Sequence, residues 1–219
     1  YLRWVAIFCL MAVGFISLAV FYYRYEAERL QSDKFEDLYT IAKLKADSIQ
    51  EWRRNRLADV QRMSFVPLVR GEIVRLLQDP TNPSAGAALQ IALKSNRKGT
   101  VYADALFLDT KGNILLAENP DPKTSDQATI KAIEVVLKDR KAVLSDFFRT
   151  PTGFICIDAL APILDNSGRP VAMVVLRSDA ADFLYPLIQT WPTPSRTAET
   201  LLVARDGDSV LFLNELRHR

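Results

Sequence analysis

An uncharged run near the N-terminus is the feature that most constrains the fold. From Trp4 to Tyr23 the chain has twenty residues without a charged side chain. As a helix rising about 1.5 Å per residue, this run is roughly 30 Å long, which matches the hydrocarbon core of a bilayer. Aromatic residues, which favour the membrane interfaces, stand at its two ends: Trp4 begins the run, Tyr22 and Tyr23 end it, and Tyr25 follows shortly after. The run predicts a transmembrane helix over residues 1–23.

A cleaved signal peptide is the alternative interpretation of this run. A signal peptide needs a shorter apolar core and small residues at a cleavage site, whereas here Phe21, Tyr22, Tyr23 and Arg24 follow. An uncleaved anchor is therefore favoured. Its orientation stays open, because Arg3 precedes the run and Arg24 follows it.

A long helical pattern comes next. Neither Pro nor Gly interrupts the chain from Tyr25 to Val66, and apolar residues recur there at helical spacing: Leu38, Ala42, Ile49, Trp52, Val60 and Met63. We expect residues 24–98 to form a long stalk helix followed by two short helices at 68–79 and 85–96. The narrow stripe suits packing on the chain's own core and the seam of a parallel homodimer equally well.

Residues 99–192 change to a β-rich pattern and predict a sheet domain. The apolar segments 102–108 and 113–117 flank a turn containing Gly112 and predict a hairpin. Three further strands are expected at 142–148, 153–164 and 170–178, and a short helical segment at 182–191. With flanking helices, this order predicts an α+β fold with a five-stranded antiparallel sheet.

The helix between the strands is predicted over residues 125–139. Ser125 is the expected N-cap, and the side chains expected to face the core are Ile130, Ile133, Val136 and Leu137.

The last part of the chain, residues 193–219, looks like the start of a second unit. Ala198 to Val203, followed by Gly207, repeats the pattern of Ala103 to Leu108, which Gly112 follows. Each half of this repeat leads into a second apolar run. The repeat predicts a linker and the first hairpin of a second, truncated sheet domain.

Composition excludes several classes of function. The net charge of +2 gives no strong attraction to nucleic acid. The single histidine, His218, and the two cysteines, Cys9 and Cys156, form no metal-binding or disulfide pattern. Because phosphate-binding and nucleophile motifs are also missing, we expect no catalytic residue, metal or cofactor in this chain.

Two charged residues in otherwise apolar strands are candidates for a binding site. If Leu164 pairs with Arg169 across the turn at 165–168, then Asp158 faces Val175 and lies diagonally across from Arg177. A carboxylate and a guanidinium in such strands are costly unless they are paired or bound. The spacing predicts an intramolecular ion pair or a ligand-binding pair, and leaves both open.

Several stretches resemble a known family. A lone N-terminal span, a long helix and two tandem PAS-like sheets are similar to the double Cache (PDC-type) extracytoplasmic sensor domains of bacterial receptors. SIQEWRRNRLADVQRM, FFRTPTG and FLYPLIQTWPTPSRTAETLLVARDGDSVLFLNELRHR resemble a group found on membrane histidine kinases and diguanylate cyclases. The resemblance implies that residues after about 24 lie in the periplasm or outside the cell, anchored in the inner membrane. It also implies that the rest of the second unit, a second span and a cytoplasmic output domain are missing.

The resemblance adds one site residue. In amino-acid-binding Cache domains an aspartate just after the last strand of the first sheet holds the ligand amine, and Asp179 is at the matching place. The Arg-x-Trp-Tyr carboxylate-binding motif of those domains has no match, since Thr150 and Pro151 follow Arg149. The candidate ligand-binding residues are therefore Tyr102, Arg149, Asp158, Arg177 and Asp179.

The expected function is ligand sensing outside the cell for a transmembrane receptor. A two-component sensor histidine kinase is the first expectation for the whole protein, with a small-molecule ligand of unknown identity and a homodimeric assembly. The alternatives are the input domain of a diguanylate cyclase or a chemoreceptor, or a structural module that dimerises and binds nothing.

Overall fold

The structure is a computed structural model of the 219-residue chain. It describes residues 1–97, 102–119, 126–151, 153–182, 184–191, 199–206, 209–212 and 214. The chain divides into two compact units, Tyr1–Asp47 and Ser48–Arg219, and each is described by itself.

The first unit is helical and belongs to α1 (Leu2–Ser64). One 18-residue window of α1, near the N-terminus, has a mean hydropathy of 2.5, so by length and composition the helix can cross a membrane. Leu38 and Ala42, the first two residues of the predicted stripe, are exposed in this unit. The predicted uninterrupted helix is confirmed.

The second unit contains the end of α1, then α2 (Pro67–Gln78) and α3 (Pro83–Arg97). Pro67 suits the first turn of α2, where its missing N–H costs nothing. The Asn82 side chain accepts a hydrogen bond from the backbone N of Ala85 at 3.0 Å and so satisfies a free donor at the start of α3. Both predicted short helices are confirmed.

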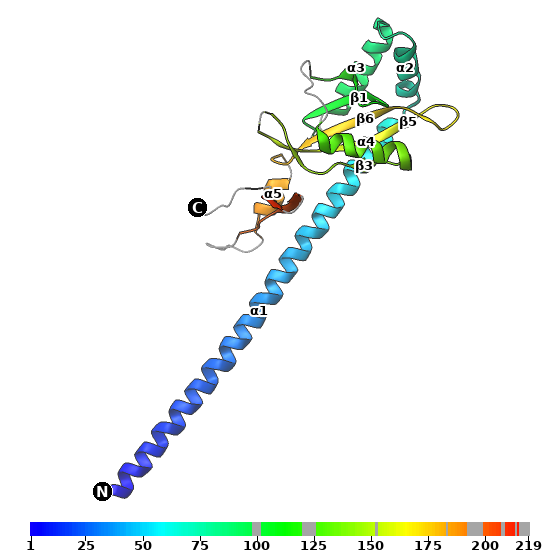
Figure 1. The fold of residues 1–219 in the computed structure, drawn as a ribbon. Coiled ribbons are helices and arrows are strands. Elements are labelled where there is room, and N and C mark those ends of the chain that lie inside the picture. The colour runs from blue at the N-terminus through cyan, green and yellow to red at the C-terminus, as the bar shows by residue number, and fades with distance from the viewer. Residues whose placement is uncertain are drawn as a thin grey trace. The chain divides into compact units, whose positions relative to one another are not determined.

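The sheet of the second unit is antiparallel throughout. Its strands are β1 (Asp104–Asp109), β2 (Ile114–Ala117), β3 (Val143–Leu144), β4 (Phe148–Arg149), β5 (Ile155–Leu164) and β6 (Pro170–Asp179). They lie in the order β2-β1-β6-β5-β3, and β4 pairs with β5 beside β3. The predicted α+β fold with five strands side by side is confirmed (Figure 1).

The segment 142–148, predicted as one strand, is divided between β3 and β4. Leu144 pairs with Ala159 and Phe148 with Cys156, so the register shifts by one residue between them. The cause is Ser145, whose hydroxyl oxygen accepts a hydrogen bond from the backbone N of Asp158 at 2.9 Å in place of a backbone carbonyl. A side chain thus replaces one rung of the ladder.

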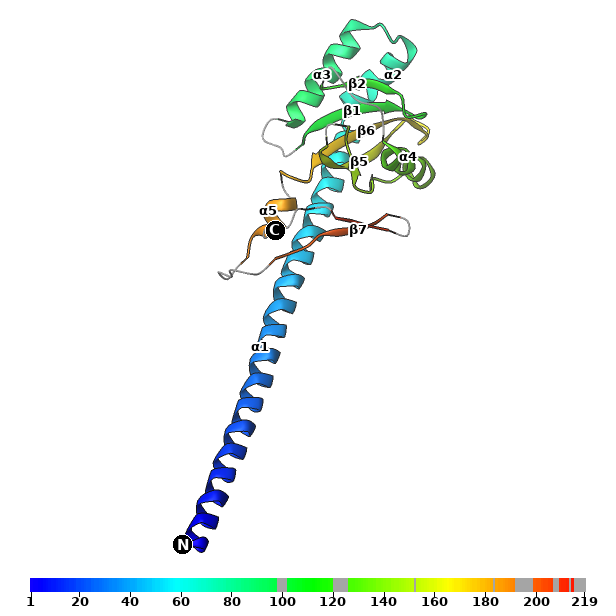
Figure 2. The same ribbon diagram turned by 60° about the vertical axis from the view of Figure 1, so that its left-hand side comes forward.

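Helices cover both faces of the sheet (Figures 1 and 2). The end of α1 with α2 and α3 packs on one face through a core that includes Val60, Ile73, Leu89 and Phe107. The helix α4 (Gln127–Asp139) packs on the other face, which we call the α4 face. The buried residues at the end of α1 include Trp52, Val60 and Met63, so this part of the predicted stripe packs on the chain's own core.

Two details predicted for α4 are wrong. Its N-cap is Asp126, whose side chain accepts a hydrogen bond from the backbone N of Ala128, while Ser125 lies outside the described residues. Ile130 is 41% exposed, and Thr129 is buried instead. Ile133 and Val136 are buried as predicted, and Leu137 packs at the edge of the same cluster.

The predicted register of the β5–β6 hairpin is also wrong. Asp165 and Arg169 close the turn, with the Asp165 N donating to the Arg169 O at 2.9 Å and the Asp165 side chain accepting from the backbone N of Ser167 and Arg169. Leu164 therefore pairs with Pro170. A further shift between Ile163 and Leu164 places Asp158 directly opposite Arg177 rather than opposite Val175.

The chain continues through α5 (Leu184–Gln189) to β7 (Val203–Asp206) and β8 (Ser209–Phe212). β7 and β8 pair with each other in a separate two-stranded sheet. The predicted hairpin is confirmed. Its assignment to a second, truncated sheet domain stays a prediction. His218 lies outside the described residues.

Candidate functional site

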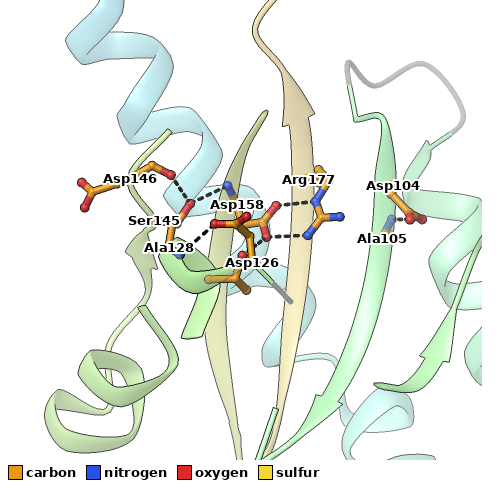
Figure 3. Close-up of polar contacts among 9 residues, drawn as sticks. Asp104, Ala105, Asp126, Ala128, Ser145, Asp146, Asp158 and Arg177 are labelled. Atoms are coloured by element: carbon orange, nitrogen blue, oxygen red, sulfur yellow. Dashed lines mark hydrogen bonds and ion pairs between the residues drawn. The ribbon is translucent and has the colours of Figure 1, made fainter. Parts of the chain in front are cut away.

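Three charged residues form a row across the α4 face of the sheet. Asp158 of β5 pairs in register with Arg177 of β6, which pairs in turn with Asp104 of β1. Residues directly opposite in an antiparallel ladder share a face, so their side chains lie together. Figure 3 shows Arg177 between the two carboxylates, with its guanidinium turned to Asp158.

Asp158 and Arg177 form a buried two-point ion pair. Nε donates to Oδ1 at 2.8 Å and Nη2 to Oδ2 at 2.9 Å. The side chain of Asp158 is 0% exposed and that of Arg177 is 11% exposed. The buried hydroxyl of Thr129, from α4, also donates to Oδ2 of Asp158 at 2.7 Å. The predicted intramolecular ion pair is confirmed, in a direct rather than a diagonal arrangement.

Electrostatics favours the charged form of Arg177. Burial by itself lowers the pKa of Arg177, but the hydrogen bonds and charge of Asp158, with a contribution from Asp104, raise it above its usual value. Asp104 is also buried, and its carboxylate accepts a hydrogen bond from the backbone N of Ala105 at 2.8 Å. One guanidinium therefore stands between two buried carboxylates.

A second row lies beside the first on the same face. Phe148 of β4 pairs with Cys156 of β5, which pairs with Asp179 at the end of β6. The guanidinium of Arg177 lies over the Phe148 ring, 5.0 Å from its centre. Burial and the nearby Asp179 raise the pKa of the Cys156 thiol to about 11. Such a thiol is protonated at neutral pH and is a poor nucleophile.

Asp179 differs from Asp158 because it reaches solvent. Its side chain accepts a hydrogen bond from the backbone N of Ala181 at 2.8 Å, and the residue is only partly buried. It is the carboxylate of the two rows that a dissolved molecule can reach most directly.

Tyr102 lies apart from these rows. It belongs to the core on the face covered by α1, α2 and α3. Its hydroxyl donates to Oδ2 of Asp59 at 2.6 Å, and the Arg56 guanidinium lies 4.6 Å from its ring centre. Burial and the hydrogen bond to Asp59 raise the pKa of Tyr102. These contacts join α1 to the start of β1.

Arg149 also lies apart. It is exposed, its Nη1 donates to the carbonyl of Gly153 at 3.0 Å, and it pairs in register with Ile155. Since neighbouring residues of a strand point to opposite faces, Arg149 lies on the other side of the sheet from Phe148 and Asp158.

The structure therefore brings together three of the five predicted site residues, namely Asp158, Arg177 and Asp179. The sequence reasoning missed five members of the same group: Asp104, Thr129, Ser145, Phe148 and Cys156. The one available signal was the acidic Asp104 at the head of an apolar strand. Within the described residues no group of three or more His, Cys, Asp or Glu side chains is arranged to hold a metal ion.

The fold is similar to that of solved ligand-binding domains of bacterial chemoreceptors. The ligand-binding domain of the Campylobacter jejuni chemoreceptor Tlp3 in complex with 4-methylisoleucine superposes with a TM-score of 0.53 at 14% identity, over 69% of this chain and 60% of that chain. The same domain with L-valine gives 0.51 at 13% identity, over 69% of this chain and 62% of that chain. The ligand-binding domain of the Pseudomonas fluorescens chemoreceptor CtaA in complex with L-isoleucine has a TM-score of 0.48 at 17% identity, over 70% of this chain and 60% of that chain.

The likeness to Tlp3 confirms the predicted Cache-like sensor fold. The chain spans about 60% of the length of that domain. No protein-family model matches the sequence. No curated protein matches it either.

Proposed function

We propose that this chain is the extracytoplasmic sensory part of a membrane receptor of the chemoreceptor class and that it binds a small molecule. The observation that carries the proposal is the shared fold with the Tlp3 ligand-binding domain. The apolar window of α1 supports anchoring in the inner membrane, with the sheet unit in the periplasm. The histidine kinase that the sequence suggested, and a diguanylate cyclase, receive no comparable support, so chemoreceptor is the preferred output class.

Within this proposal the ligand contacts Asp179, the solvent-accessible residue at the end of the second row on the α4 face. Asp179 has a partly exposed carboxylate, whereas Asp158 already receives three hydrogen bonds from protein side chains. We assign Asp158 and Arg177 to positioning this end of the sheet, and Asp179 to the ligand. The Tlp3 domain is solved in complex with L-valine and with isoleucine, so aliphatic amino acids belong in the first panel tested.

We also propose that the receptor is a homodimer, because Leu38 and Ala42 of the predicted stripe are exposed and can form a seam with a second copy.

We further propose that β7 and β8 begin a second sheet domain. β7 and β8 pair only with each other among the described strands, and a two-stranded sheet is marginal in isolation. Val203, Val210 and Phe212 are exposed, and pairing of Val203 with Phe212 places them on one face. Three of the four residues on this face are apolar and the fourth is Arg205, so the face suits packing against further strands or helices.

Thermal unfolding of the full chain in lipid nanodiscs, with a panel of amino acids and other small metabolites, tests ligand binding. A ligand present at 100 times its Kd stabilises by about 2.7 kcal/mol, so a binder raises the melting temperature measurably. Asp179→Asn should abolish the shift, whereas Asp139→Asn, at an exposed position at the end of α4, should keep it. A shift of equal size in both variants would place the ligand elsewhere, and a panel without any binder would count against the proposal.

A further inference from the structure

A groove lies in the helical layer, on the other side of the sheet from Asp158. It has a volume of about 450 Å³ and runs between the end of α1, α2 and α3. This volume is within the range of about 300–1,000 Å³ that small-molecule sites occupy. The lining of the groove includes Met63, Val66, Leu68, Val69 and Ile91, with Asp59 and Arg62 at one end.

The wall of the groove is apolar and partly open to solvent. Met63 and Val69 are buried at its base, whereas Val66, Leu68 and Ile91 are 40%, 57% and 68% exposed. Single exposed apolar residues are ordinary, but several gathered around one groove indicate a surface that binds something.

The polar end of the groove carries excess positive charge. Oδ1 of Asp59 accepts a hydrogen bond from Arg62, and Oδ2 accepts one from the Tyr102 hydroxyl and lies 3.7 Å from Nη2 of Arg56. Two guanidinium groups thus share one carboxylate. The side chain of Arg62 is 78% exposed, which leaves its other N–H groups available at the mouth of the groove.

Arg56 does not line the groove, but it adds positive charge beside Asp59. Its side chain is 13% exposed, and in the part of the chain that the structure describes its buried Nε and Nη1 have no hydrogen-bond acceptor. The local field at Asp59 is therefore that of a net cation beside an apolar wall. An anionic group next to a hydrocarbon body matches both features.

We propose that this groove is a second binding site, which takes a small molecule composed of an apolar body and a carboxylate. The apolar body lies against Met63, Leu68 and Ile91, and the carboxylate accepts hydrogen bonds from Arg62. This site is separate from the one at Asp179 and does not depend on the proposed function.

Isothermal titration of the full chain in nanodiscs with 4-phenylbutyrate tests the site, with empty nanodiscs as the blank. Saturable binding at one site per chain is expected. The matched amine, 4-phenylbutylamine, has the same apolar body with the opposite charge and should bind at least about tenfold more weakly, because it loses a charged hydrogen bond. Equal affinity for the two compounds, or no saturable binding of either, would overturn the proposal.

A charge pair at Ile91 places the probe in the groove. Because Ile91 is 68% exposed, Ile91→Glu and Ile91→Lys leave the buried core unchanged. Ile91→Glu should weaken 4-phenylbutyrate binding about tenfold or more, because it removes an apolar contact and adds a like charge to the groove. Ile91→Lys removes the same contact but adds a charge of the opposite sign, so it should weaken binding less. Ile130→Glu, at a 41% exposed position on α4, is the control and should leave the affinity unchanged. The same affinity for 4-phenylbutyrate in all three variants would show that the probe does not bind in the groove.

The Asp179 site is tested separately in the same assay. Asp179→Asn should leave 4-phenylbutyrate binding intact if the groove holds the probe, whether or not the metabolite panel finds a ligand for Asp179. Loss of probe binding in Asp179→Asn together with full binding in Ile91→Glu would place the probe on the sheet and overturn the second site.

Discussion

At the scale of single residues, Asp158 is the centre of the polar contacts on the α4 face of the sheet. Its carboxylate is completely buried and receives hydrogen bonds from Arg177 and Thr129, while its backbone N donates to Ser145. A buried ion pair contributes little net stability, since desolvation of both charges offsets their attraction. The removal of one partner is costly, because the other charge is then buried without compensation.

Asp158→Ala is therefore expected to lower the free energy of unfolding by about 3–5 kcal/mol. The double variant Asp158→Leu with Arg177→Met should recover part of this loss, because it removes the unpaired guanidinium but leaves the buried carboxylate of Asp104 without its neighbouring cation. Urea unfolding of the full chain in detergent micelles, followed by circular dichroism, measures both. Lys34→Ala, which breaks the exposed pair with Asp37, is the control and should change stability by less than about 1 kcal/mol. A double variant as unstable as Asp158→Ala would contradict the view that the loss comes from leaving Arg177 buried without Asp158.

At the scale of elements, the turn between β1 and β2 lies close to α4. The Asp109 side chain accepts hydrogen bonds from the backbone N of Lys111 and of Asn113, which shapes the turn. Gly112 has a φ of +86°, and a Cβ at this position would lie 3.2 Å from Cδ1 of Ile133 in α4. The turn therefore needs glycine for its backbone and also for the space beside the helix.

Gly112→Ala should destabilise the protein more than Gly168→Ala does. Gly168, in the β5–β6 turn, has a similar φ of +76°, but a Cβ added there would meet no atom within 4 Å. Both substitutions carry the left-handed backbone cost of about 1–2 kcal/mol, and Gly112→Ala adds the contact with Ile133. Urea unfolding of the two variants side by side gives the difference, and equal losses would show that Ile133 moves aside freely.

The elements themselves follow from the sequence, but their register does not. Periodicity predicts α2, α3, α4 and the long strands, because apolar spacing reflects burial directly. The pairing of Asp158 with Arg177 depends on Asp165 closing the turn and on a shift at Ile163, and neither leaves a trace in hydrophobicity. Thr129 was missed for a related reason: it is a polar residue on a buried helical stripe, and only its partner Asp158 explains it.

At the scale of the whole molecule, the apolar window of α1 is expected to hold the protein in a membrane. Replacing both Met11 and Phe15 by arginine costs about 2.5–3.5 kcal/mol for each charge at the centre of a spanning helix. The double variant should appear in the soluble fraction after carbonate extraction of membranes. Arginine at both Leu30 and Phe35, which are exposed and outside the predicted span, should leave the protein in the pellet. Retention of both variants alike would argue against insertion of residues 1–23.

The break between β3 and β4 has a consequence for association between molecules. Along this edge the strands are only two residues long each, and Ser145 displaces the chain between them. A long, flat edge invites a strand from another molecule and is a route to aggregation, whereas a short and interrupted edge offers too few consecutive donors and acceptors. The side of the sheet beside Asp158 is thereby protected against intermolecular β-pairing, even when many copies of the protein are crowded together.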